Sequence, residues 1–207
     1  AKVVVATSDP NPLVAGRGLD RLRAAGIVVE LLPPDSEPAR ASRELNIGFV
    51  SRMTRGRPWL RLKAAASLDG KTALNNGISQ WITGPEARQD GHRWRARACA
   101  ILTGIGTVKA DDPRLTVREV ETPRQPLKVV VDSRLEISEK AKALSEGKVL
   151  IFSGIENKRN LNAEVIPLPN QNGKVELPKM LEELARRGVN ELHVEAGFRL
   201  NGSLVRE

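Results

Sequence analysis

Two glycines directly follow an apolar run in the segment Ile101-Leu102-Thr103-Gly104-Ile105-Gly106. The run predicts a strand, and the residues after it predict a short helix. Glycine at such a junction lets backbone N–H groups approach a phosphate, and the helix N-terminus adds favourable charge. The segment lacks the third glycine of the dinucleotide-binding fingerprint Gly-x-Gly-x-x-Gly. A phosphate site and a tight structural turn are both compatible with this pattern.

Acids and arginines lie close together around a proline in the next segment, Asp111 to Arg118. Asp111 could accept a hydrogen bond from a hydroxyl-bearing ligand. The guanidinium of Arg118 could bind a phosphate, whose oxygens match its planar set of donors. The alternative is a solvated loop in which Asp112 caps a turn, and the spacing does not decide between the two.

A third candidate site lies at Val194-Glu195-Ala196-Gly197, where an expected strand gives way to an expected helix. Ligands of open α/β sheets bind beyond the carboxyl ends of the strands. Glu195 and the turn at Gly197 are therefore placed where a site would form. An ordinary strand-to-helix turn has the same pattern.

The two histidines, His92 and His193, are expected to be structural or surface residues, because neither has a partner acid in a recognisable arrangement. Most arginines of the helix expected at 85–98 are assigned to the solvated surface, with Arg88 and Arg95 on one face. One cysteine, Cys99, and two histidines predict neither an intrachain disulfide nor a metal site.

The composition points to a folded protein that attracts small anions. The chain has 207 residues, with 33 Lys and Arg against 25 Asp and Glu, and a net charge of +8. Nucleic acid, an acidic membrane surface or a phosphorylated small molecule would suit that charge. Aromatic residues make up only 3%, so the stacking platforms of single-strand binders are scarce. Without a membrane-length apolar run or signal-peptide pattern, we expect a soluble cytoplasmic protein.

Strands and helices are expected to alternate, which would place the candidate residues at strand ends. Alternating or β-branched runs predict strands at 2–6, 27–29, 60–66, 100–103, 127–132, 148–152, 164–168 and 191–195. Helical spacing predicts helices at 19–25, 39–52, 85–98, 180–187 and 198–205. This alternation indicates an α/β fold with a largely parallel central sheet.

Two local patterns refine this outline. The spacing of Thr83 and Glu86 matches a capping box that opens the helix at 85–98. Lys63 is a cation on the less apolar side of the strand at 60–66, which it shares with Arg61. A basic segment with Gly and Pro predicts a linker at 53–58, between an N-terminal piece at 1–52 and a main domain at 59–207.

Five motifs occur in the order in which one family has them. They are Lys63-Ala-Ala-Ala-Ser-Leu-Asp-Gly-Lys-Thr-Ala, Ser79-Gln-Trp-Ile-Thr, Gly106-Thr-Val-Lys-Ala-Asp-Asp-Pro-Arg-Leu-Thr-Val-Arg, Val131-Asp-Ser and Val194-Glu-Ala-Gly. Together they resemble the reductase domain of the bifunctional riboflavin-biosynthesis pyrimidine deaminase/reductase. Two further segments, Asp9-Pro-Asn-Pro-Leu-Val-Ala-Gly-Arg-Gly and Leu45-Asn-Ile-Gly-Phe, resemble the closing part of that family's deaminase domain. The resemblance covers nearly the whole chain.

The resemblance implies a dihydrofolate-reductase-like three-layer α/β reductase domain over residues 59–207. It implies a remnant of a cytidine-deaminase-like α/β domain over residues 1–52. The family's reductase continues for several strands past the Glu195 motif, so truncation at both ends is expected. The family's deaminase uses a His-x-Glu motif and a Pro-Cys-containing zinc motif, neither of which is expected in this chain, so zinc is expected only in the deaminase domain of the parent protein.

The activity that the resemblance implies is an NADPH-dependent reduction in riboflavin biosynthesis. The ribosyl group of 5-amino-6-(5-phosphoribosylamino)uracil becomes a ribityl group, and the parent chain also deaminates the diaminopyrimidine precursor. The implied ligands are NADPH and the phosphorylated pyrimidine, with no nucleic-acid or membrane partner. A homodimer is expected.

The family's site positions carry over to named residues of this chain. Lys63, Asp111 and Glu195 are expected to handle protons. The expected substrate positions are Lys63, Ser79, Arg95, Leu115, Arg118 and Glu195. The expected dinucleotide positions are Ala65, Trp81, Thr107, Asp111, Ser133, Gly197, Phe198, Arg199, Leu200, Asn201, Gly202 and Ser203.

Two other functions are compatible with parts of the sequence. A related pteridine or dihydrofolate-type reductase would share the dinucleotide half of the site. A nucleic-acid-binding module could use the basic stretch from Arg52 to Lys63, but no aromatic stackers alternate with it.

Overall fold

The computed structural model of the chain describes residues 1–79 and 81–207 and contains a six-stranded parallel sheet. The strands lie in the order β3-β8-β4-β5-β6-β7, so the last strand is inserted between the first two. Their bounds are β3 (Trp59–Leu62), β4 (Ala100–Gly104), β5 (Leu127–Val131), β6 (Val149–Ser153), β7 (Glu164–Pro167) and β8 (Glu191–Val194). The predicted α/β fold with a largely parallel sheet is confirmed.

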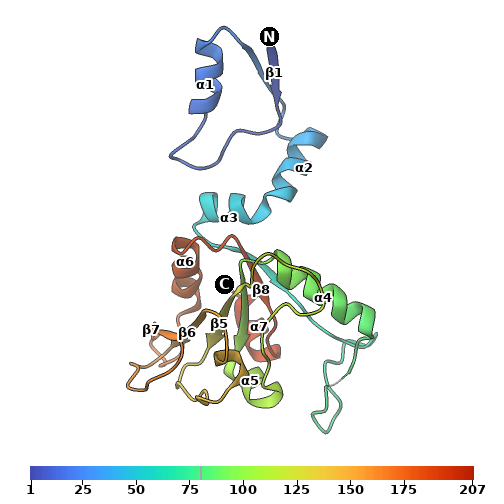
Figure 1. Cartoon of the computed structure of the whole chain (residues 1–207), viewed down its shortest axis with the longest axis vertical. Helices are drawn as coiled ribbons and strands as arrows, with labels where there is room; N and C mark the ends of the chain where they lie inside the picture. The colour runs from blue at the N-terminus through green and yellow to red at the C-terminus, as the bar shows by residue number, and fades with distance from the viewer. Residues whose placement is uncertain (80) are drawn as a thin grey trace.

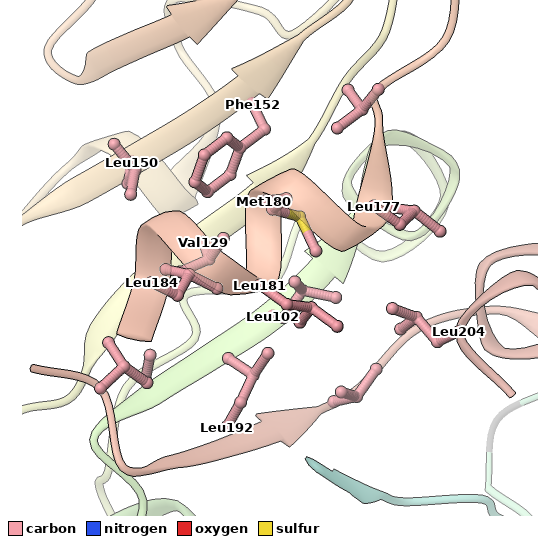
Figure 2. Close-up of a cluster of buried hydrophobic side chains, with 14 residues drawn as sticks. Leu102, Val129, Leu150, Phe152, Leu177, Met180, Leu181, Leu184, Leu192 and Leu204 are labelled. Carbon is pink, nitrogen blue, oxygen red and sulfur yellow. The ribbon is translucent and has the colours of Figure 1, made fainter. Parts of the chain in front are cut away.

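One face of the sheet is covered by α6 (Leu177–Arg186) and α7 (Phe198–Leu204). The apolar residues of α6 recur at helical spacing, so one side of the helix is apolar, as the sequence predicted. Figure 2 shows these side chains packed on those of β4, β5, β6 and β8. The labelled members of this core are Leu102, Val129, Leu150, Phe152, Leu177, Met180, Leu181, Leu184, Leu192 and Leu204.

The opposite face carries α4 (Pro85–Arg97) and α5 (Ile105–Asp111), so the domain has three layers (Figure 1). Its apolar clusters are smaller, and polar side chains are buried among them. Lys128 is 1% exposed, and its ammonium donates to the carbonyl oxygens of Ala143 at 3.1 Å and Glu146 at 2.7 Å. Burial lowers the pKa of Lys128.

The N-terminal unit lies apart from the sheet and contacts it through α3 (Ile47–Arg55) (Figure 1). Within residues 1–38, all of which the structure describes, no side chain is buried. The backbone of Gly48 approaches the start of β8 so closely that a Cβ there would lie 2.5 Å from Glu191 Cγ. The unit contains β1 (Lys2–Val5), α1 (Arg17–Ala24), β2 (Val28–Leu31), α2 (Glu37–Leu45) and α3 (Ile47–Arg55), with β1 and β2 parallel.

The helix predicted at 39–52 is wrong in detail, because the structure has two helices that meet at Asn46. The Asn46 amide donates to the carbonyl oxygen of Ser42 at 2.9 Å, which ends α2. The second helix extends to Arg55 and ends at Gly56, whose φ of +64° lies in the left-handed region. Half of the predicted linker at 53–58 is therefore helical.

Two other local predictions are also corrected. The strand predicted at 60–66 ends at Leu62, because its neighbour β8 ends at Val194 and the backbone N–H of Lys63 makes the last ladder bond, at 3.0 Å. The capping box at Thr83 does not form. Gly84 is the N-cap of α4, with no side-chain cap, and Pro85 occupies the first turn.

Candidate active site

A cavity of about 820 Å³ lies beyond the carboxyl ends of β4 and β5. Parallel strands bring the residues that follow them to one edge, which is where ligands of α/β sheets bind. The turn after β8 reaches the same edge, and Leu200 of α7 packs against Gly104, where a Cβ would lie 3.2 Å from Leu200 Cδ2. Eight of the predicted positions line this cavity: Ser79, Thr107, Asp111, Ser133, Gly197, Phe198, Arg199 and Leu200.

The turn after β5 forms one wall of the large cavity. Asp132 is fully buried, and its Oδ2 accepts a hydrogen bond of 2.8 Å from the backbone N–H of Ile137. The hydroxyl of Ser133 accepts a hydrogen bond of 3.1 Å from the backbone N–H of Val175. The Asp132 bond closes the turn, and the Ser133 bond fixes it against the hairpin at 170–175, which carries Lys174 into the cavity wall.

A second cavity, of about 410 Å³, lies between β3, β8 and α4. Lys63 and Glu195 line it together with His193 and Trp94. The guanidinium of Arg61 stacks on the Trp94 ring, 3.8 Å from the ring centroid. The structure thus brings two of the three predicted catalytic residues to one cavity.

Glu195 is held tightly by Arg95. The Arg95 Nε donates to Oε1 at 2.5 Å and one of its terminal nitrogens donates to Oε2 at 2.7 Å, while the other terminal nitrogen donates to the Thr116 carbonyl oxygen at 3.0 Å. Thr103 also donates its hydroxyl to the Glu195 carbonyl oxygen at 2.7 Å. Burial alone would raise the pKa of Glu195, but Arg95, and after it His193, outweigh burial and hold the pKa well below its usual range.

A third cavity, of about 450 Å³, contains the predicted residues Trp81, Asp111 and Arg118. Asp111 lines this cavity as well as the large one, so it stands between them. Two further cations, Arg114 and Lys142, also line it, together with Asp112 and Pro113. This cavity is therefore suited to a phosphate.

The loop from Asp111 to Arg118 is anchored rather than freely solvated. Asp112 accepts a hydrogen bond of 2.8 Å from the backbone N–H of Lys142, and this bond is the main reason that its pKa is lowered. The backbone N–H of Arg118 donates to Nδ1 of His92 at 3.1 Å. Burial and the nearby charge of Arg95 lower the pKa of His92.

Six predicted site positions lie outside the three cavities. Arg95 is engaged by Glu195, and its side chain is 14% exposed rather than on the solvated surface. The side chain of Leu115 is 2% exposed and packs with Ile101 and Ala143, so only its backbone could reach a ligand. Asn201 donates its amide to the Ala196 carbonyl oxygen at 3.0 Å. The others are Ala65, Gly202 and Ser203, the last of which lines a smaller neighbouring cavity.

Both histidines are buried, but the expectation that neither has a partner acid is wrong, since both rings lie near one. His193 Nε2 is 3.4 Å from Glu195 Oε1, and His92 Nε2 is 3.7 Å from Glu119. Alternate residues of a strand share a face, so the spacing of His193 and Glu195 carried this signal. The letters His-Val-Glu at 193–195 do match a His-x-Glu pattern, but no described group of three His, Cys, Asp or Glu side chains could hold a metal.

Sequence reasoning also missed two cations of the large cavity, Arg134 and Lys174. Arg134 follows the Val131-Asp-Ser motif directly, which was a usable signal. Lys174 lies in a hairpin turn far along the chain, and only the fold brings it to the cavity.

None of the helices that the structure describes has the length and apolar character of a membrane span.

Comparison with known proteins decides the family. Residues 58–207 match the family model described as the RibD C-terminal domain. The chain belongs to the RibD family. The riboflavin biosynthesis protein RibD of Bacillus amyloliquefaciens is 41% identical over 214 residues, covering 99% of this chain and 56% of that protein. RibD of Escherichia coli is 39% identical over 222 residues, with 99% and 59% covered.

Solved structures agree with this assignment. Acinetobacter baumannii RibD matches with a TM-score of 0.84 and 37% identity, covering 99% of this chain and 57% of that one. A Thermotoga maritima protein, named as a diaminohydroxyphosphoribosylaminopyrimidine deaminase/5-amino-6-(5-phosphoribosylamino)uracil reductase, matches with a TM-score of 0.81 and 32% identity, with 95% and 53% covered. The chain thus spans less than two thirds of the length of its RibD relatives. The resemblance and fold class predicted from the five motifs are confirmed.

Proposed function

We propose that this chain carries the reductase activity of a RibD protein. It reduces the ribosyl group of 5-amino-6-(5-phosphoribosylamino)uracil to the ribityl group, with NADPH as the reductant. The single observation that supports this most is that Asp111 lines both the large cavity and the cationic cavity of Arg114, Arg118 and Lys142, so that the two are adjacent. A dinucleotide and a sugar phosphate would lie side by side in such an arrangement.

The large cavity fits a dinucleotide in volume and in lining. Its volume of about 820 Å³ lies within the range of roughly 300–1,000 Å³ that is usual for small-molecule sites. Thr107 and the residues from Gly197 to Leu200 would hold the dinucleotide beside β4, and Ser133 would hold it beside β5. The cofactor supplies a hydride when bound.

The charges around the large cavity support NADPH over NADH. Arg134, Lys174 and Arg199 line it, and an arginine near the ribose is the usual partner of the additional phosphate of NADPH. Glu136 also lines the cavity and pairs with Arg134 at 2.8 Å. An anionic phosphate would compete with this exposed acid for the guanidinium.

The substrate phosphate is assigned to the cationic cavity, where Arg118 lies with Arg114 and Lys142. Arginine binds phosphate through paired donors, and lysine adds a point charge. The sugar would then extend toward Lys63 and Glu195 in the neighbouring cavity. This arrangement would place the phosphate and the reacting carbon of the sugar in different cavities.

The reduction needs protons as well as a hydride. Opening of the sugar ring makes C1′ an imine carbon and the ring oxygen a hydroxyl, and a hydride at C1′ and a proton at nitrogen complete the amine. Glu195 is held ionised by Arg95, so its role is to accept hydrogen bonds and stabilise positive charge at the reacting carbon. Lys63 and Asp111 are then the groups that handle protons.

The remaining proposals concern the parent protein. Residues 1–52 are proposed as the closing part of a deaminase domain whose zinc ligands lie outside this chain, with 53–58 as the connection to a reductase domain over 59–207. The parent would also deaminate the diaminopyrimidine precursor. A homodimer in the cytoplasm is proposed, with no nucleic-acid or membrane partner.

The test is a turnover assay on the purified chain with NADPH and the phosphorylated ribosylaminouracil. The proposal expects NADPH oxidation with this substrate, weaker oxidation with its dephosphorylated form and none with dihydrofolate. A matched assay with NADH should show a much higher KM for the dinucleotide. Oxidation that depends on dihydrofolate instead would favour a different reductase.

A further inference from the structure

The buried ring of His193 has two nitrogen atoms that no described residue satisfies. His193 is 2% exposed, and neither Nδ1 nor Nε2 has a hydrogen-bond partner among residues 1–79 and 81–207. The chain's other histidine, His92, is also buried, but its Nδ1 accepts a hydrogen bond from Arg118. An unsatisfied buried polar group destabilises a fold. Packing alone therefore does not explain His193.

The position of the ring on β8 links it to the candidate site. His193 lies in register with Arg61 of β3 and Ile101 of β4, on the face of the sheet covered by α4. It lines the 410 Å³ cavity with Lys63 and Glu195. Its Nε2 lies 3.4 Å from Glu195 Oε1, although this contact does not form a hydrogen bond. Even so, the ring already contributes to the lowered pKa of Glu195.

The charged groups around His193 come from both strands and from α4. Arg95 binds Glu195 from α4, and the other charged residues that line the cavity are Arg61, Lys63, Arg88, Asp90 and Glu195. Four cations thus face two carboxylates. Among the described residues, the hydrogen bonds to the Glu195 carboxylate come from Arg95 on α4. The imidazole of His193 can add an N–H donor from the side of β8.

We propose that His193 is a positioning residue for Glu195. This inference rests on the reductase function proposed above. When the substrate occupies the cavity, the Nε2–H of His193 donates to Glu195 Oε1. Arg95 holds the carboxylate from the helix and His193 holds it from the strand, so that its oxygens keep one orientation toward the sugar. The ring stays unsatisfied until then, which is the kind of stability cost that functional sites carry.

The proposal and a purely structural role make opposite predictions for leucine at this position. If the ring only fills the core, His193→Leu removes an unsatisfied polar group and leaves turnover unchanged. If the ring positions Glu195, the same variant keeps or raises the thermal midpoint and yet lowers kcat. Loss of one hydrogen bond to a charged group corresponds to roughly a tenfold lower kcat.

The experiment compares three variants of the chain by thermal unfolding, NADPH affinity and steady-state turnover. His193→Leu removes the donor, and His193→Gln keeps an amide N–H near the position of Nε2. Ile101→Leu is the matched control, because Ile101 lies in register with His193 on β4 and is fully buried outside the cavity. We expect a roughly tenfold lower kcat for His193→Leu, most of it restored in His193→Gln, with NADPH affinity unchanged throughout.

Each other outcome overturns a specific statement. A kcat of His193→Leu within twofold of the parent chain overturns the positioning role, as does a glutamine variant as slow as the leucine variant. A leucine variant that does not fold shows that the ring is structural, and this also overturns the role. A parent chain that neither binds NADPH nor turns over contradicts the proposed function itself, and the inference fails with it.

Discussion

The two faces of the six-stranded sheet are built from the same strands, but they bury different kinds of side chain. On the α6 side, the core consists of apolar side chains that fit between the helix and the strands (Figure 2). On the α4 side, the sheet buries Lys128, His193 and Thr103, and it supports the ion pair between Arg95 and Glu195. The cavity that holds Lys63 and Glu195 opens on this second side.

This difference shows how alternate residues of one strand can serve separate purposes. In β8, Leu192 and Val194 point into the apolar core, while His193 lies on the opposite face, toward the cavity that Glu195 also lines. The apolar side can therefore contribute most of the stability. The other side can then tolerate the desolvation of charged groups that ligand binding requires.

The largest effect is expected for Arg95→Ala. The variant leaves the Glu195 carboxylate 15% exposed without its main partner, and breaking a buried ion pair costs about 3–5 kcal/mol of the free energy of unfolding. Turnover should be lost as well. Arg93→Ala is the control, since Arg93 lies on the same helix with 62% of its side chain exposed. Chemical denaturation of both variants measures the difference in their free energies of unfolding. Equal values would show that the α4 face does not depend on the buried ion pair.

A comparable loss of stability, without a specific loss of function, is expected for Leu184→Ala. Leu184 is fully buried on α6, and such truncations cost about 2–5 kcal/mol. Lys179→Ala, at an exposed position of the same helix, should change stability by less than about 0.5 kcal/mol. KM for both ligands should stay unchanged below the unfolding transition. A raised KM in Leu184→Ala would show that the apolar face also shapes the site.

The stability of Glu195→Gln relative to the parent chain should depend on pH. Because the pKa of Glu195 is lowered in the folded state, its stabilisation is complete above the ordinary value of 4.5 and is lost as the pH falls through the lowered pKa. The variant should be less stable by about 1.5–3 kcal/mol at neutral pH. The gap should narrow in acid, as followed by denaturation at a series of pH values. A gap that does not change with pH would contradict the charged state of Glu195.

A smaller and more selective effect is expected for Arg118→Ala. Arg118 is exposed in the cationic cavity and its side chain makes one weak hydrogen bond, to Thr116 at 3.3 Å. Its removal should raise the KM of the phosphorylated substrate by roughly tenfold, which matches one charge-assisted contact. The affinity for NADPH should change little. Equal losses for both ligands would show that the two cavities do not separate them.

Regular elements were predictable where a single face was buried. The apolar spacing of α6 and the β-branched run of β5 both gave the right element, because burial on the sheet agrees with the local pattern. The break at Asn46 was not predicted, since it depends on the docking of Gly48 against the start of β8. The early end of β3 depends on where its only neighbour ends.

The candidate site was predictable in its motifs but not in its detailed contacts. Thr107, Asp111 and Ser133 follow strands, so their common location could be expected from a parallel sheet. The engagement of Arg95 by Glu195 joins residues 100 positions apart. No local pattern specifies which arginine of a helix meets which acid of a strand, and the same holds for Lys174 at the cavity wall.

Binding of NADPH in the large cavity can be tested by measuring the NADPH affinity of the parent chain and of the variant Gly106→Leu. Gly106 lines the cavity, and a Cβ there meets nothing within 4 Å. The leucine variant can therefore fold, and its side chain would fill part of the cavity. Gly18→Leu in α1 is the control, because Gly18 has equally open surroundings. We expect saturable NADPH binding in the parent chain and in Gly18→Leu and none in Gly106→Leu, whereas equal binding in all three would show that NADPH does not occupy this cavity.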